Sequence, residues 1–186
     1  MEFEYQSNDL SAYDNIEYLG AATARYCNVI AIDEKHVMFP LNSELHIWSY
    51  DTRLPLPSED LKEEEKSVEK FDGRLEIKQS VANANIQVLV ESDSTWVGVT
   101  YDGEVIVIQK QDIETLKQQN GFQQIARLKT DCWFVRDAAV SKSGDTIAFV
   151  SEAPDDHSVI ILSLENQELK IIQEIKNIPD STIRQC

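Results

Sequence analysis

A strand–turn–strand unit recurs along the chain, and this repeat restricts the fold more than any other feature of the sequence. In its clearest copy, the apolar strand Ala138–Val140 is followed by the polar turn Ser141–Asp145 and a second strand, Thr146–Val150. The acidic segment Glu152–His157 is expected to form the next turn, before a third strand at Val159–Leu164. Short apolar runs bounded by polar turns predict antiparallel strands.

Two upstream segments repeat this layout when the three copies are aligned through their second strands. These strands, HVMFPL, TWVGVT and DTIAFV, begin at His36, Thr95 and Asp145. The periods are 59 residues, from 36 to 95, and 50 residues, from 95 to 145. A more exposed fourth strand is expected to complete each unit. Four strands at this spacing are typical of one β-propeller blade. The sequence therefore predicts an all-β, propeller-like fold of about three four-stranded antiparallel blades.

The units are separated by polar or charged segments. The first unit is the longest because it contains an acidic insertion at 52–72, where Pro55 and Pro57 interrupt any strand and the charge run indicates an exposed loop or a short helix. A second polar segment, 113–121, is predicted as either a short helix ended by glycine or a polar connection. The expected organisation is an N-terminal arm or closing strand at 1–23, blade-like units at 24–80, 84–130 and 131–178, and a polar tail at 179–186.

Two motifs carry a resemblance to a known family. Ile47–Asp51 (IWSYD) is a loose form of a strand that ends in Trp-Asp, and Ser141–Asp145 (SKSGD) has the form of a turn between the first two strands of a blade. Over about Ala24–Ile178 the chain resembles the WD-repeat superfamily of β-propellers, in a degenerate form. Because no unit has the Gly-His pair that normally precedes the first strand, the resemblance does not extend to the His/Asp network of well-formed blades.

Three blades leave sheet edges open, whereas closed propellers have roughly four to eight blades. Open edges favour pairing with another chain. We therefore expect this chain to be part of a larger propeller, or a partner chain to cap the open edges. A compact β-sandwich of antiparallel strands is the competing architecture.

Charge and cysteine usage restrict partners and compartment. The chain has 33 acidic and 17 basic residues, a formal net charge of -16, which opposes direct binding to nucleic acid and favours other protein subunits, basic ones among them. Three cysteines without a CxxC pair predict neither a disulfide framework nor a zinc site, so we expect an intracellular protein, cytoplasmic or nuclear. The N-terminus lacks the pattern of a signal peptide, and no apolar run has membrane-spanning length.

The sequence has no recognisable catalytic motif. It contains neither a glycine-rich phosphate loop nor HExxH, and we expect no cofactor and no bound metal. The sole local acid–histidine grouping, Asp155–Ser158, is consecutive in one expected turn, where neighbouring side chains diverge. We therefore predict a protein that is not an enzyme. A site at the propeller axis would need acids that converge from several blades.

Candidate contact residues come from tryptophans, acids and a basic group. Trp48, Trp96 and Trp133 could each anchor a partner, although core packing is the alternative for all three. Trp48 lies between polar neighbours, so we expect it to be the one that is partly exposed. Arg127, Lys129 and Arg136 could meet an acidic partner or simply lie on a solvated outer strand. The predicted partner-binding residues are Trp48, Tyr50, Glu63, Glu64, Glu65, Arg127, Lys129 and Arg136.

These observations favour one function and leave a second open. The first is a non-catalytic scaffold or adaptor subunit of an intracellular multiprotein complex, because propellers present loops on a rigid frame. The second is an accessory WD-repeat subunit of an RNA-modifying complex of the tRNA methyltransferase type, which the general layout resembles. In that case the acidic chain would act through its enzyme partner.

Overall fold

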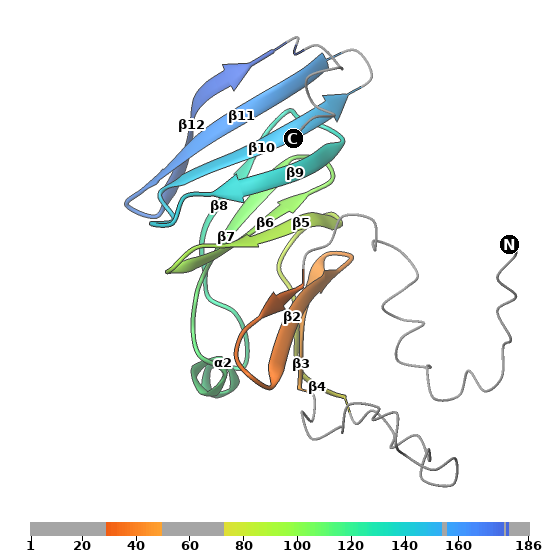
Figure 1. Ribbon diagram of the computed structural model, residues 1–186, viewed down its shortest axis with the longest axis vertical. Helices are drawn as coiled ribbons and strands as arrows, with labels where there is room; N and C mark the ends of the chain where they lie inside the picture. Colours follow the sequence, from red (N-terminus) through yellow and green to blue (C-terminus); the bar gives the residue numbers. More distant parts are fainter. Residues whose placement is uncertain (1–28, 50–72, 154–155, 177, 179–186) are drawn as a thin grey trace, which may run out of the picture.

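The computed structural model describes residues 29–49, 73–153, 156–176 and 178, and these residues form three antiparallel sheets of four strands each (Figure 1). The first sheet consists of β1 (Ile30–Ala31), β2 (His36–Leu41), β3 (Glu44–Ser49) and β4 (Arg74–Ser80). The second consists of β5 (Ile86–Glu91), β6 (Thr95–Thr100), β7 (Glu104–Gln109) and β8 (Gln124–Lys129). The third consists of β9 (Val135–Val140), β10 (Thr146–Ala153), β11 (Asp156–Glu165) and β12 (Glu168–Ile175).

Each sheet is a meander in which strands adjacent in the sequence pair with one another. The three sheets are stacked in sequence order, with the second between the other two (Figure 1). The first strands of neighbouring sheets contact each other, β1 against β5 and β5 against β9, and the last strands β8 and β12 also meet. This arrangement confirms the predicted all-β, propeller-like fold of four-stranded blades.

The second sheet is buried on both faces, and its sequence shows why. In the register of β6 and β7, Trp96 lies opposite Ile108 and Val97 lies opposite Val107. Strand residues alternate between faces, so Trp96 and Ile108 join the core shared with the first sheet, while Val97 and Val107 join the core shared with the third. A strand that is buried on both faces needs a continuous apolar run, which VIVI in β7 supplies.

The third sheet is buried on one face. Ile147, Phe149, Ile160 and Leu162 pack against the second sheet and are at most 1% exposed. Their neighbours in the same strands point to the opposite face, which we call the open face of the third sheet. The apolar residues on the central strands of this face are Ala148, Val150, Val159 and Ile161, all of them partly exposed.

The polar segment after β7 contains the helix α2 (Ile113–Gln119), so the helical alternative for 113–121 is the right one. The carboxylate of Asp112 accepts a hydrogen bond from the backbone N–H of Thr115 and caps the N-terminus. Asn120 ends the helix in a left-handed conformation. The apolar face of α2 carries Ile113 and Leu116 into the core between the first and second sheets.

The predicted acidic turn Glu152–His157 is wrong in extent. β10 continues to Ala153 and β11 begins at Asp156, with Glu152 opposite His157, so both strands extend through most of this segment. The polar residues of this segment predict a turn, but strands at the end of the β10–β11 hairpin can pair without apolar side chains on both faces. The predicted arm at 1–23, insertion at 52–72 and tail at 179–186 lie outside the described residues. No helix in the described ranges is long and apolar enough to cross a membrane.

Candidate functional site

A cavity of about 310 Å³ lies at the junction of the second and third sheets. One wall is formed by Thr130–Trp133 of the connection between β8 and β9. We call this connection, residues Thr130–Phe134, the Trp133 loop. The opposite wall belongs to β10, β11 and β12. The lining residues outside the loop are Ser151, Ser158, Ile160, Ile171, Glu174 and Lys176.

Trp133 lies at this cavity with 59% of its surface exposed to solvent. The other two tryptophans differ: Trp96 is fully buried, and Trp48 is partly buried with its indole Nε1 enclosed. Trp48 is partly exposed as expected, but the expectation that it ranks first among the three tryptophans is wrong, because Trp133 is far more exposed. Trp48 lies opposite Val37 and Leu75 in the first sheet, whereas Trp133 lies outside any strand and has no cross-strand neighbours to cover it.

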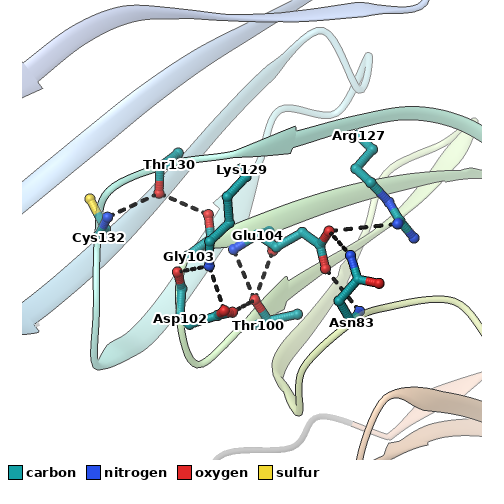
Figure 2. A network of polar contacts seen from close by, with 9 residues as sticks. All are labelled: Asn83, Thr100, Asp102, Gly103, Glu104, Arg127, Lys129, Thr130 and Cys132. Carbon is teal, nitrogen blue, oxygen red and sulfur yellow. Dashed lines mark hydrogen bonds and ion pairs between the residues drawn. The ribbon is translucent and has the colours of Figure 1, made fainter.

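The backbone at the start of the Trp133 loop is fixed by the turn between β6 and β7 (Figure 2). The carbonyl oxygen of Gly103 accepts hydrogen bonds from the backbone N–H of Thr130 at 3.1 Å and from its hydroxyl at 2.8 Å. The same hydroxyl accepts a hydrogen bond from the backbone N–H of Cys132 at 3.3 Å. The loop is therefore held to a hairpin of the second sheet before it reaches Trp133.

Gly103 is required at this contact. Its φ of +80° is in the left-handed region, and a Cβ there would lie 2.5 Å from the hydroxyl oxygen of Thr130 and 2.6 Å from the carbonyl oxygen of Cys132. Any larger residue would push the loop away from the hairpin. The Asp-Gly pair that predicts a hairpin turn thus also positions the connection to the third sheet.

The end of the loop is fixed by the third sheet and by an aromatic pair. The hydroxyl of buried Ser151 donates to the carbonyl oxygen of Trp133 at 2.5 Å, and the backbone N–H of Glu152 donates to that of Phe134 at 3.1 Å. Phe134 has a positive φ of 57° and packs edge-to-face on Tyr101, with ring centroids 4.9 Å apart. A non-glycine residue in this conformation persists where its surroundings hold it.

A buried carboxylate supports the same hairpin (Figure 2). The side chain of Glu104 is 5% exposed and accepts two hydrogen bonds from Asn83, one from the backbone N–H at 3.0 Å and one from Nδ2 at 2.9 Å. Arg127 Nη1 lies 3.6 Å from the same carboxylate. A buried charge with these partners is compensated and has a structural role.

A second ion pair of this hairpin joins Asp102, in the turn beside Gly103, to Lys129. Its carboxylate lies 2.5 Å from Lys129 Nζ and accepts a hydrogen bond from the hydroxyl of Thr100 at 2.5 Å. Burial alone would raise the pKa of Asp102, but the hydrogen bonds from Lys129 and Thr100 outweigh it, and the pKa lies below its ordinary value.

The three basic residues predicted as partner contacts all have acidic partners within the chain. Arg127 is paired with Glu104 and Lys129 with Asp102, and Arg136 Nε lies 2.5 Å from the Glu152 carboxylate. They do not form one free basic patch, because each cation is next to a carboxylate of the same sheet. Their role in partner binding, like that of Trp48, stays a prediction. The other predicted contacts, Tyr50, Glu63, Glu64 and Glu65, lie outside the described residues.

The cavity presents groups suited to binding. Its lining residues include an aromatic residue, two acids, one lysine and two isoleucines: Trp133, Asp131, Glu174, Lys176, Ile160 and Ile171. Within the described residues, no group of three or more His, Cys, Asp or Glu side chains could hold a metal ion.

The partner-binding residues predicted from the sequence do not include Trp133, which lines the cavity. The signal was present in Asp131–Phe134 (DCWF), where two adjacent aromatic residues interrupt a polar connection between strands. In the structure both aromatic residues remain partly at the surface, Trp133 more so than Phe134.

The sequence matches no family model and no curated protein. Two solved structures have a similar fold. Sqt1 from Saccharomyces cerevisiae is 12% identical, with a TM-score of 0.49, over 76% of this chain and 32% of Sqt1. A putative 6-phosphogluconolactonase from Bacteroides uniformis is 15% identical, with a TM-score of 0.54, over 78% of this chain and 39% of that protein. The second likeness agrees with the propeller-like fold, and the chain spans less than half of either neighbour.

Proposed function

We propose that this chain is a non-catalytic adaptor, a degenerate WD-repeat propeller that binds a protein partner through the Trp133 loop. The observation that carries the proposal is the contrast within this loop. Its backbone is hydrogen-bonded to the second sheet at one end and to the third sheet at the other, while Trp133 remains 59% exposed.

The fixed backbone is favourable for binding because association is opposed by the entropy lost on ordering loops and side chains. A loop whose backbone is already held by hydrogen bonds loses less conformational entropy when it binds. Tryptophan is among the residues that contribute most at protein interfaces, and truncation of such an anchor typically costs about 2 kcal/mol or more of binding free energy. The Trp133 loop therefore has the composition and the preorganisation of an interface anchor.

The open face of the third sheet is a second contact surface in this proposal. Val97 and Val99 of β6 are fully buried where the third sheet covers them, and Ala148 and Val150 of β10 lie on the face of the third sheet that points away from the second. The open face of the third sheet is therefore apolar like the face of the second sheet that the third sheet covers, but no described residues pack on it as a further sheet. A further antiparallel sheet that presents large apolar side chains would fit it, as Ile147 and Phe149 fit the second sheet.

Affinity purification of matched variants from cells tests the proposal. The Trp133→Ala variant removes the exposed indole, and the Leu75→Ala variant removes another exposed apolar side chain, 41% exposed, in the first sheet. We expect a stoichiometric partner to be recovered with the wild type and with Leu75→Ala, and to be lost with Trp133→Ala. An unchanged partner set with a folded Trp133→Ala variant would refute the Trp133 loop as the anchor.

A further inference from the structure

We propose that the cavity beside Trp133 accepts the guanidinium group of an arginine presented by the partner. This inference rests on the proposed function, because it names the chemistry that the same loop would recognise. It follows from three properties of the cavity: the exposed indole, the carboxylates around it, and its size and aliphatic wall.

The indole of Trp133 is the first of these properties. A cation over the face of an aromatic ring is attracted by the ring quadrupole, and tryptophan is the best of the aromatic residues for this contact. Arginine is favoured over lysine because its guanidinium is planar, stacks on aromatic faces and is more weakly hydrated.

Two carboxylates on different elements are the second property. Asp131 lies in the Trp133 loop itself and lines the cavity. Glu174 lines the cavity from β12, and its contact with Lys176 at 3.2 Å joins side chains that are 39% and 54% exposed. Such an exposed pair is weak, and a guanidinium can form paired hydrogen bonds to the Glu174 carboxylate, which an ammonium group cannot. The net charge of -16 also attracts cations over longer distances.

The size and the aliphatic wall of the cavity are the third property. At about 310 Å³ it is at the lower limit of ligand pockets, which are roughly 300–1,000 Å³, so it suits one or two side chains rather than a large cofactor. Ile160 and Ile171 supply apolar surface. Arginine buries its aliphatic stem on such surface while its charged end remains near carboxylates.

Nuclear magnetic resonance of the whole chain tests this inference directly. The chain has three tryptophans, so the Trp133 indole N–H signal can be assigned as the one that disappears in the Trp133→Phe variant. The probes are capped Gly-Arg-Gly, Gly-citrulline-Gly and Gly-Glu-Gly peptides. Citrulline has the shape of arginine without its charge. We expect the arginine peptide to shift the Trp133 signal saturably, with an affinity roughly tenfold higher than that of the citrulline peptide.

Matched charge variants sharpen the test. Asp131→Asn should weaken binding of the arginine peptide roughly five- to tenfold, because it removes one carboxylate from the cavity. Glu165→Gln removes an exposed acid at the other end of β11 and should leave the affinity unchanged.

The outcomes separate this inference from the proposed function. Equal shifts with arginine and citrulline peptides, or no shift with either, would overturn the guanidinium site. If Trp133→Ala still loses its partner in affinity purification, the adaptor function stands without the guanidinium site. If Trp133→Ala retains the partner, the proposed function itself fails.

Discussion

The two junctions between sheets are closed in different ways. Between the first and second sheets, Trp96 is fully buried and packs edge-to-face on Phe122, with ring centroids 6.2 Å apart. Leu116 of α2 fills the same core. Between the second and third sheets, valines of β6 and β7 pack on Ile147 and Phe149, but a cavity of about 310 Å³ remains beside Trp133.

The difference shows how position in the chain determines what a tryptophan does. Trp96 occupies a strand position whose register directs it at the neighbouring sheet, so it contributes to stability. Trp133 occupies a connection whose backbone is held by Gly103, Thr130 and Ser151, so its side chain remains at the surface. The closed junction therefore supports the fold, and the partly open junction is the binding surface that we propose.

The largest expected effect is the loss of stability in Trp96→Ala. Truncation of a fully buried tryptophan leaves a cavity, and we expect a decrease of about 3–5 kcal/mol in the free energy of unfolding. Denaturant unfolding followed by circular dichroism measures it. A decrease below about 1 kcal/mol, the typical effect of an average substitution, would contradict a structural role for this junction.

Gly103→Ala should cause the next largest loss of stability. It should also move the Trp133 loop, because Gly103 contacts Thr130. The substitution forces a side chain into a positive-φ position, which costs about 1–3 kcal/mol, and places a Cβ against Thr130. We expect lower stability together with a displaced Trp133 indole signal in the NMR spectrum. An unchanged Trp133 signal would show that the hairpin does not position the loop.

Acidification should weaken the same hairpin. The pKa of Asp102 lies below its ordinary value in the folded chain, so its stabilising contribution is present above pH 3.8 and is lost as the pH falls through the lowered pKa. The free energy of unfolding should therefore fall as the pH is lowered from about 5 to 2, and less steeply in Asp102→Asn. Identical pH profiles of the two proteins would contradict this account of the Asp102–Lys129 pair.

Trp133→Ala should have the smallest effect on stability. Because more than half of the side chain is exposed, we expect the free energy of unfolding to change by no more than about 0.5 kcal/mol, as for most surface positions. The control is the change in the free energy of unfolding of Trp96→Ala, measured under the same conditions. A loss as large as that of Trp96→Ala would mean that Trp133 stabilises the fold and would remove the argument for a binding role.

The sequence predicts the strands well because their signals are local. The alternation in β4 and the Asp-Gly turn before β7 both place strands where the structure has them. The candidate site depends on contacts between distant positions. Gly103 meets Thr130, and Ser151 meets Trp133, over separations of 27 and 18 residues that no local pattern encodes. In the sequence the basic residues resemble a free cluster, because the carboxylates that pair with them lie on other strands or in the turn between β6 and β7.

Site-specific photo-crosslinking tests the central claim, that Trp133 contacts a partner, most directly. A photoreactive phenylalanine derivative is placed at position 133 and, as the control, at exposed position 75 of the first sheet. We predict that irradiation in cells produces one defined adduct from position 133 and none of that mass from position 75. Absence of an adduct at position 133, or the same adduct from both positions, would contradict the claim that the Trp133 loop is the binding surface of this protein.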